Sequence, residues 1–458
     1  MIANMLRRNI ILAAGCSIIV LAGCARPEQG ASPVTAETAE RLAFDGALGW
    51  AAATPGGRGG EIIRVTTLAG EGPGSLREAI AAKGPRIIVF EVGGVIDLNL
   101  TTLDVKEPFL TIAGQTAPSP GVTLIRGGMD IRTHDVIVQH IRIRTGQAGQ
   151  EPGGGWEADA LSTQAGAYNV IVDHCSLTWG VDENLSASGP RFSGDGPDAW
   201  RAGASHDITF SNNIVAEGLA HSTHPKFEHS KGSLIHDNSS NILIYGNLYA
   251  HNFERNPLFK GGVRGAIVNN LIYNPGQRAL HYNLQELEWG DVEPLNGRMT
   301  VVGNVLRGGM STAPNLPFLM IGGDGDLDFY GEDNLAVDRF GETLPMFGRY
   351  TTTAARIVEH ETPLDWPEGL EAFKAEEVQA RVLADVGARP WDRDGHDVRI
   401  LADTAEGRGK IIDNENEVGG YPVQHETRRA FDPSLWDMET MQPVSPDALD
   451  SGAKARGT

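Results

Sequence analysis

The chain of 458 residues is long enough for one large repetitive domain or for two to three ordinary domains. Its 41% hydrophobic and 21% charged residues exclude a disordered chain and a multispan membrane protein. The formal net charge of −21 argues against nucleic acid as a partner, and an anionic ligand would need a local group of cations or a bridging metal. Glycine makes up 57 of the residues, well above the usual ~7%, which favours a β-rich fold with many turns.

Residues 1–23 are predicted to be a lipoprotein signal peptide. Two arginines precede an apolar stretch over residues 10–20, which is too short to span a bilayer as a mature helix. The segment Leu-Ala-Gly-Cys that ends at Cys24 resembles a bacterial lipobox, so we expect Cys24 to become the acylated first residue. An ordinary signal peptide that is cut near Ala25 is the alternative.

The expected mature protein is exported, as an outer-membrane lipoprotein or at the cell surface or in the periplasm of a Gram-negative bacterium. It would contact the membrane only through the N-terminal lipid, and we expect a monomer. The polar residues 24–45, which include Pro, Thr and Glu, predict a flexible tether. Because Cys175 is the only cysteine after Cys24, the mature chain has no intramolecular disulfide framework.

Short apolar strands recur through the middle of the chain, and most of them end in asparagine. Their last positions follow one another at intervals of 34, 38, 34, 23 and 34 residues: Ile141, Cys175, Asn213, Asn247, Asn270 and Asn304. A repeat of this length without helical periodicity predicts a solenoid, and the shortest interval fits three strands with their turns. The asparagines are then expected to form a column of side-chain amides that bond from coil to coil. An irregular β-sandwich is the alternative.

The solenoid is predicted to span residues 46–335. A capping-box pattern at Ser75 and Glu78 predicts a helix over 76–82 that covers the first coil, followed by a strand over 87–90. Beyond residue 335 the asparagine pattern fades. Residues 336–458 are therefore expected to be a C-terminal extension that packs on the solenoid, with a helix over 370–386 and an Asp- and Gly-rich loop over 395–420.

One group of acidic residues has the spacing of a single coil. Asp159 and Asp182 are 23 residues apart, and Glu157 and Glu183 are 26 apart, so these carboxylates are expected to stack on neighbouring coils. Carboxylates that lie close together repel one another unless they are protonated or neutralised. Calcium, which takes roughly six to eight oxygen ligands, is the expected cation. For any one of these residues a solvated turn is the simpler interpretation.

A group of basic residues follows on later coils. Lys231 and Arg255 are 24 residues apart, and Lys260 and Arg264 follow closely. In a chain of strong negative charge, a cationic stripe beside a metal-capable acidic group suits an acidic sugar polymer, whose carboxylates would bind the metal and the cations. The alternative is that these side chains only make the surface soluble.

The motifs around these residues resemble those of the family-one pectate lyases. The similar elements are the run from Asp159 through Val-Asp-His-Cys-Ser-Leu-Thr-Trp to Asp182, and Arg-x-Pro-x-x-Lys from Arg255 to Lys260. The similarity covers roughly residues 55–310. It implies a right-handed parallel β-helix that cleaves polygalacturonate by Ca²⁺-assisted β-elimination. In that reaction a base removes the C5 proton, the C4 oxygen departs, and a 4,5-unsaturated oligogalacturonide is released.

The resemblance also implies roles for single residues. Glu157, Asp159 and Asp182 match the calcium carboxylates, Arg255 matches the catalytic base, and Lys231 and Lys260 match substrate-binding cations. Arginine is normally a fixed cation, and neighbouring positive charges would have to lower its pKa for it to act as a base.

Two positions depart from the family pattern. Lys260 stands where arginine is usual, and Ser186 stands where a calcium aspartate is common, unless Glu183 takes over that role. Asp173 and His174 belong to a strand motif and are expected to be structural.

Other functions remain open at this point. The substrate could be pectin or another uronate polymer. A β-helix hydrolase of the polygalacturonase type would need converging aspartates, for which Asp324, Asp326 and Asp328 are the other dense group, although they better fit a glycine-rich turn. A non-catalytic glycan-binding lipoprotein is the third possibility, for which Lys260 and Ser186 would be signs of lost activity.

Overall fold

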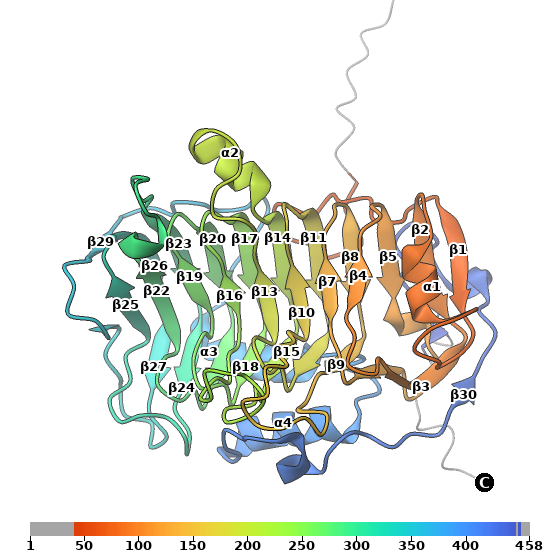
Figure 1. The fold of residues 1–458 in the computed structure, drawn as a ribbon. Helices are drawn as coiled ribbons and strands as arrows, with labels where there is room; N and C mark the ends of the chain where they lie inside the picture. The colour runs from red at the N-terminus through yellow and green to blue at the C-terminus, as the bar shows by residue number, and fades with distance from the viewer. Residues whose placement is uncertain (1–40, 446–447, 450–458) are drawn as a thin grey trace, which may run out of the picture. The chain divides into compact units, whose positions relative to one another are not determined.

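The computed structural model describes residues 41–445 and 448–449, which belong to one compact unit. The chain winds in coils, and each full coil adds one strand to each of three parallel sheets (Figure 1). Each strand pairs with the strands of the coils before and after it, as Val170 does with Val136 and Ile208. This is the predicted right-handed parallel β-helix, and the predicted all-β class is confirmed.

The strands of each sheet succeed one another along the β-helix. The first sheet contains β1 (Glu61–Val65), β2 (Arg86–Phe90), β5 (Leu110–Ala113), β8 (Val136–Gln139), β11 (Tyr168–Asp173), β14 (His206–Ser211), β17 (Ser240–Tyr245), β20 (Arg264–Val268), β23 (Gly297–Val302), β26 (Leu327–Glu332) and β29 (Ile357–Glu359). The second contains β3 (Val92–Asp97), β6 (Val122–Ile125), β9 (Arg142–Arg144), β12 (Ser176–Thr178), β15 (Ile214–Ala216), β18 (Leu248–Ala250), β21 (Leu271–Tyr273), β24 (Val305–Arg307) and β27 (Leu335–Val337). The third contains β4 (Leu103–Val105), β7 (Met129–Ile131), β10 (Leu161–Thr163), β13 (Leu185–Ala187), β16 (Leu234–Ile235), β19 (Leu258–Lys260), β22 (Leu280–Leu284), β25 (Leu319–Gly323) and β28 (Phe347–Arg349).

The inside of the coils is filled by apolar side chains from all three sheets. Val138, Ile143 and Leu161 are fully buried members of this core, one from each sheet. Because side chains of a strand alternate between its two faces, the residues between them point outward, as Ser162 does on β10. The third sheet therefore presents polar side chains on its outer face.

The predicted asparagine column is present and is buried. Each side chain bonds to the next one along the helix axis: Asn213 Nδ2 donates to Asn247 Oδ1 at 3.0 Å, and Asn247 Nδ2 donates to Asn270 Oδ1 at 2.9 Å. Asn270 continues the ladder to Asn304, and Asn304 continues it to Asn334. These bonds satisfy polar groups that would otherwise be unpaired in the interior, and they hold the turn between the first and second sheets in register.

The first coil is covered by α1 (Leu76–Ala81), which confirms the predicted capping helix. Ser75 Oγ accepts a hydrogen bond from the Glu78 amide at 3.2 Å. The Glu78 carboxylate reaches back to the Gly74 amide instead of the Ser75 amide, so the box closes one residue earlier than predicted. Leu76 and Ile80 join the interior core.

The predicted tether is wrong at its end. Within residues 24–45, Ala43 and Phe44 are buried and pack on Ile137 and Ile171 of the first sheet. Apolar side chains at these positions give the segment a surface to bury, which a free tether lacks. Cys24 and the predicted signal peptide lie outside the described residues.

The β-helix also continues past residue 335, where we predicted its end. The strands β27, β28 and β29 extend all three sheets as far as Glu359. The physical reason is that Asn334 continues the asparagine ladder and the later strands still find parallel partners.

The extension that follows runs back along the β-helix (Figure 1). Its helix α3 (Ala375–Asp385) packs on the second sheet, and β30 (Thr427–Arg428) pairs antiparallel with β3. A second helix, α4 (Gly395–Glu406), occupies part of the segment predicted to be a loop; Asp394 caps its start and Gly407 ends it in the left-handed conformation.

Shorter elements complete the described residues. These are α2 (Gly196–Gly203), η1 (Gly114–Thr116), η2 (Glu286–Glu288), η3 (Glu415–Val418) and η4 (Pro433–Leu435). Among the helices of the described residues, none combines the length and the apolar character that crossing a membrane requires. The thiol of Cys175 is free and buried.

Candidate functional site

The predicted acidic residues meet on the turns that lead from the second sheet into the third. Asp159 precedes β10, and Asp182 and Glu183 precede β13. Leu161 pairs with Leu185, so the two turns are stacked one coil apart. The Glu183 amide donates to Asp159 Oδ1 at 3.0 Å, and one carboxylate oxygen from each of the three residues lies within 4.8 Å of the others.

These carboxylates line a cavity of about 270 Å³ on the outer face of the third sheet. Other oxygen donors border it: Asp130, Glu157, Ser162 and Ser186. The buried Ser186 hydroxyl beside Asp159 makes no hydrogen bond of normal geometry within the described part of the chain. Hard oxygen donors in this number fit Ca²⁺.

The carboxylates of the cavity strongly influence one another. Burial, with the charges of Asp182 and Asp130, raises the pKa of Asp159 well above its usual value. Burial alone would also raise the pKa of Asp182, but hydrogen bonding to His229 and the charge of His229 outweigh it and hold that pKa below its usual value. A bound cation would relieve the repulsion between Asp159 and Asp182.

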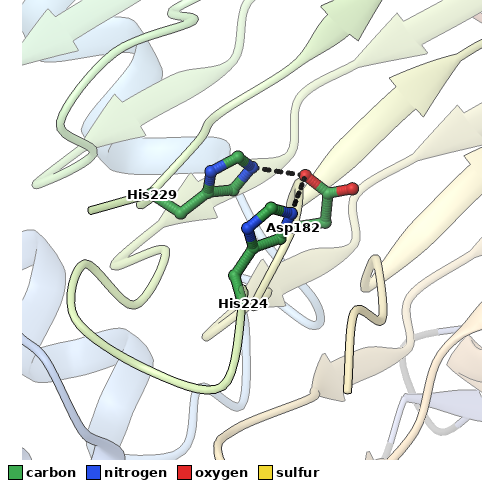
Figure 2. Close-up of side chains that lie close together, drawn as sticks. All are labelled: Asp182, His224 and His229. Carbon is green, nitrogen blue, oxygen red and sulfur yellow. Dashed lines mark hydrogen bonds and ion pairs between the residues drawn. The ribbon is translucent and has the colours of Figure 1, made fainter. Parts of the chain in front are cut away.

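Two histidines that the sequence analysis missed lie against Asp182 (Figure 2). His229 Nε2 is 2.5 Å from Asp182 Oδ1, and His224 Nε2 is 3.8 Å from the same oxygen. The two rings are stacked, with centroids 3.7 Å apart and an angle of 6° between their planes. Burial lowers the pKa of both imidazoles. Their positions in the long 217–233 connection could not be read from a strand pattern.

Arg255, the predicted catalytic base, lies beside the acidic residues. Arg255, on the turn before β19, makes an ion pair with Glu183. Its side chain is largely buried, and burial lowers the pKa of the guanidinium although the charges of Asp182 and Asp159 oppose this shift. Glu183 therefore connects Asp159 and Asp182 to Arg255.

Lys231 lies on the neighbouring turn, before β16. Its Nζ is 2.5 Å from Glu254 Oε1, and Glu254 also pairs with Arg278 on the turn before β22. Burial, with the positive charge of Arg278, lowers the pKa of Lys231 to about 7. Arg278 in turn stacks over the ring of Tyr350 at 4.6 Å.

Glu254 and Arg278 were not predicted. The spacing could have indicated Arg278, because it follows Arg255 by 23 residues, the length of the shortest coil.

Lys260 belongs to a different group of charged residues. It ends β19, where its Nζ lies 3.4 Å from Asp237 Oδ2 and pairs with Glu288. Arg191 contacts the same two carboxylates. Lys260 is therefore held in a balanced cluster of four charges, and it is not placed against Asp159 or Asp182 by any interaction of the described residues.

The structure separates Arg264 from the predicted site. Arg264 begins β20, a strand of the first sheet, and its charged surroundings are Arg201 and Asp365. The three residues between Lys260 and Arg264 turn the chain from one sheet to the next, so proximity in sequence misled the prediction.

The aspartates of the hydrolase alternative do not converge. Asp326 binds Arg356 at 2.7 Å, Asp328 lies 2.9 Å from His360, and Asp324 accepts a hydrogen bond from the Glu286 amide. Each carboxylate is engaged by its own partner, as expected of a turn.

No protein-family model matches the chain. Curated relatives include the probable pectate lyase C of Emericella nidulans, 37% identical over 245 residues, which are 53% of this chain and 50% of that protein. The probable pectate lyase C of Aspergillus terreus is 39% identical over 236 residues, 51% of this chain and 48% of that protein. The chain thus spans about half the length of the curated relatives it matches.

Solved structures extend the likeness to most of the chain. The major cedar-pollen allergen Jun a 1 matches with a TM-score of 0.51 and 17% identity over 74% of this chain and 92% of that one. The thermostable pectate lyase PL 47 matches with a TM-score of 0.51 and 16% identity over 75% and 97% of the two chains. The chain therefore has the parallel β-helix fold of pectate lyases, and about half of it is similar in sequence to proteins named as probable pectate lyases.

Proposed function

We propose that the protein is a pectate lyase that cleaves polygalacturonate by β-elimination at the turns before β10, β13, β16 and β19. The observation that carries this proposal is the Glu183–Arg255 ion pair, which sets a buried guanidinium beside the carboxylates of Asp159 and Asp182. Elimination from an acidic sugar needs a cation that binds the sugar carboxylate and a base near C5. The carboxylates can hold such a cation, and Arg255 can serve as the base.

The oxygen donors that would hold Ca²⁺ are Glu157, Asp159 and Asp182, with Ser186 beside them. When bound, Ca²⁺ supplies positive charge that attracts a uronate carboxylate and stabilises the negative charge that develops on it. Glu183 is engaged by Arg255, so we assign it to positioning the base and not to the metal.

The chain's own residues account for the proton transfer. Arg255 would accept the C5 proton as a neutral guanidine, after its guanidinium has left the Glu183 ion pair and released one proton to the solvent. The burial of Arg255 shifts its pKa in the direction that this release requires. Lys231 and Arg278 present positive charge on the next turns, where they would bind uronate carboxylates. Elimination breaks the C4–O bond and forms the C4–C5 double bond, and the departing oxygen gains one proton in place of the one taken from C5. The net reaction therefore consumes neither a nucleophile nor water.

Incubation with polygalacturonate tests this function. A lyase produces unsaturated ends, which are followed by ultraviolet absorbance, and removal of Ca²⁺ by a chelator should abolish them until Ca²⁺ is returned. Saturated reducing ends without absorbance would indicate a hydrolase, and retention on the polymer without cleavage would indicate a binding protein; either result overturns the proposal. Pectin and other uronans assayed beside polygalacturonate identify the preferred polymer.

The cellular setting is a separate proposal. We propose that Cys24 carries a lipid that anchors an exported monomer to the outer membrane. Incorporation of labelled palmitate in the producing bacterium, lost in a Cys24→Ala variant, tests the anchor. Light scattering of the protein that lacks residues 1–40 tests the monomer.

A further inference from the structure

The His224–His229 pair belongs to a loop that is tied closely to the proposed calcium site. The Thr223 hydroxyl donates to the Trp156 carbonyl at 2.6 Å, and the Gly155 amide donates to the Thr223 carbonyl at 2.9 Å. The His229 amide donates to the Ala220 carbonyl at 2.8 Å. These bonds tie the loop that carries both histidines to the segment that carries Glu157.

Both rings turn the same nitrogen toward carboxylates (Figure 2). His229 Nε2 lies 2.5 Å from Asp182 Oδ1, a hydrogen-bond distance. His224 Nε2 lies 3.8 Å from Asp182 Oδ1 and 3.7 Å from Glu157 Oε2, so it faces the space between two proposed calcium ligands. Each histidine is only 2% exposed, so water does not compete freely for these nitrogens.

The hydrogen bonds identify which ring nitrogens carry protons. His224 Nδ1 accepts a hydrogen bond from the Lys226 amide at 3.1 Å, so the proton of the neutral ring must be on Nε2. His229 Nε2 lies at hydrogen-bond distance from Asp182 Oδ1. An ionised carboxylate can only accept, so in a bond to ionised Asp182 this nitrogen carries the proton. Metal-bound histidine has the opposite arrangement, with a free lone pair toward the metal and the other nitrogen donating.

We propose that His224 and His229 are positioning residues that orient Asp182 for calcium by donating from Nε2, and that they are not metal ligands themselves. The proposal rests on the proposed function, because it needs Ca²⁺ at the carboxylates. The donated hydrogen bond occupies Asp182 Oδ1 and leaves the second oxygen free for the cation. Because no imidazole lone pair enters the site, its ligands are oxygens, and it selects Ca²⁺ over cations that prefer nitrogen, such as Zn²⁺.

Calcium titration by calorimetry on the full folded chain tests this role without relying on activity. His229→Met removes the donor at similar size, and His229→Gln keeps an N–H in its place. We expect His229→Met to weaken Ca²⁺ binding by about 10- to 100-fold, the usual effect of removing a group that orients a metal ligand. His229→Gln should retain most of the affinity. His221, an exposed histidine of the same loop that pairs with Asp413, supplies the control, and His221→Met should bind Ca²⁺ normally.

Titration with Zn²⁺ and the histidine ring spectra complete the test. The ¹⁵N signals of His224 should show a protonated Nε2 and an unprotonated Nδ1. Tighter binding of Zn²⁺ than of Ca²⁺, lost in both His229 variants, would make the pair metal ligands and overturn the proposal. Unchanged Ca²⁺ binding in His229→Met would also overturn it, even if polygalacturonate is cleaved. Conversely, the expected calcium losses without any cleavage would leave the positioning role in place and refute the proposed function.

Discussion

Lys231 and Glu254 form a buried ion pair on adjacent turns of the β-helix, with Nζ 2.5 Å from Oε1. Because Glu254 also binds Arg278, it holds two cations side by side on the turns that the proposed function assigns to uronate binding. Glu254→Gln would leave those cations with only a neutral amide between them. We expect this variant to lose about 3–5 kcal/mol of unfolding free energy, as is usual when one partner of a buried pair is removed, and to bind polygalacturonate weakly.

Urea unfolding and substrate titration measure these two effects. The exposed pair Lys106–Asp104 provides the control, since Asp104→Asn should change stability by less than about 1 kcal/mol. Equal losses in the two variants would show that the burial of Glu254 has no consequence.

Alanine variants of Arg255 and Arg264 compare a residue of the proposed site with a residue outside it. Arg255→Ala should reduce the rate of unsaturated-end formation by about 10²- to 10⁴-fold, the range of a lost general base, while binding of polygalacturonate largely remains. Arg264→Ala, on another sheet, should leave the rate unchanged. Initial rates of both variants at saturating substrate measure this difference. A full rate in Arg255→Ala would remove this arginine from the mechanism.

The sequence was informative where the structure repeats. A β-helix coil returns the chain to the same position, so the spacing of Asp159 and Asp182 was enough to predict that they meet, and the asparagine interval was enough to predict the ladder. The histidines were missed because the 217–233 connection leaves the coil pattern, and its path depends on bonds such as that from the Thr223 hydroxyl to the Trp156 carbonyl.

A corner between two sheets explains the error at Arg264. Lys260 and Arg264 are separated by only four positions, but the chain turns between them, so they face different surfaces. The helix α4 was missed although Asp394 caps its start, and tertiary contacts add to that cap: Asp394 and Asp397 bind two arginines of β9. Local composition alone favoured a loop there.

The ion pairs between β9 and the start of α4 are expected to hold the C-terminal extension on the β-helix. Arg142, Arg144 and Asp397 are fully buried, and the Ser176 hydroxyl also donates to Asp397 at 2.8 Å. Asp397→Asn would leave buried positive charge only partly balanced, and we expect a loss of about 3–5 kcal/mol in urea unfolding. Glu377→Gln, which breaks an exposed pair with Arg381 on α3, should cost about 0.5 kcal/mol or less. A similar small cost for Asp397→Asn would mean that α4 docks without this network.

Substitutions in the asparagine ladder should destabilise the protein more at its buried middle than at its partly exposed end. Asn270 is fully buried and bonds on both sides, so Asn270→Ala should destabilise the protein by about 1–3 kcal/mol for each buried group left unpaired. Asn334 is the last member found in the described residues and is partly exposed, so Asn334→Ala should cost less. Equal melting temperatures of the two variants would contradict this role of the ladder.

We expect His174 to make a contribution to the free energy of unfolding that depends on pH. Burial opposes its charge, but Asp173 at 2.7 Å and Asp385 at 3.4 Å outweigh burial and raise the pKa of His174 to about 10. Since the folded pKa lies above the unfolded value of about 6.5, the stabilisation is complete below pH ~6.5 and is lost as the pH rises through about 10. The charged ring also links β11 to the end of α3, where Asp385 lies.

The comparison of wild type with His174→Gln isolates this term from other titrations. At pH 6 the variant should be less stable by about 1.5–3 kcal/mol, the range for hydrogen bonds to charged groups, and the difference should shrink between pH 7 and pH 10. His360→Gln, at an exposed histidine that lies 2.9 Å from Asp328, is the control in which we expect only a small difference at every pH. A difference for His174→Gln that stayed constant up to pH 10 would mean that the ring stabilises β11 by packing, because only the charge is removed by raising the pH.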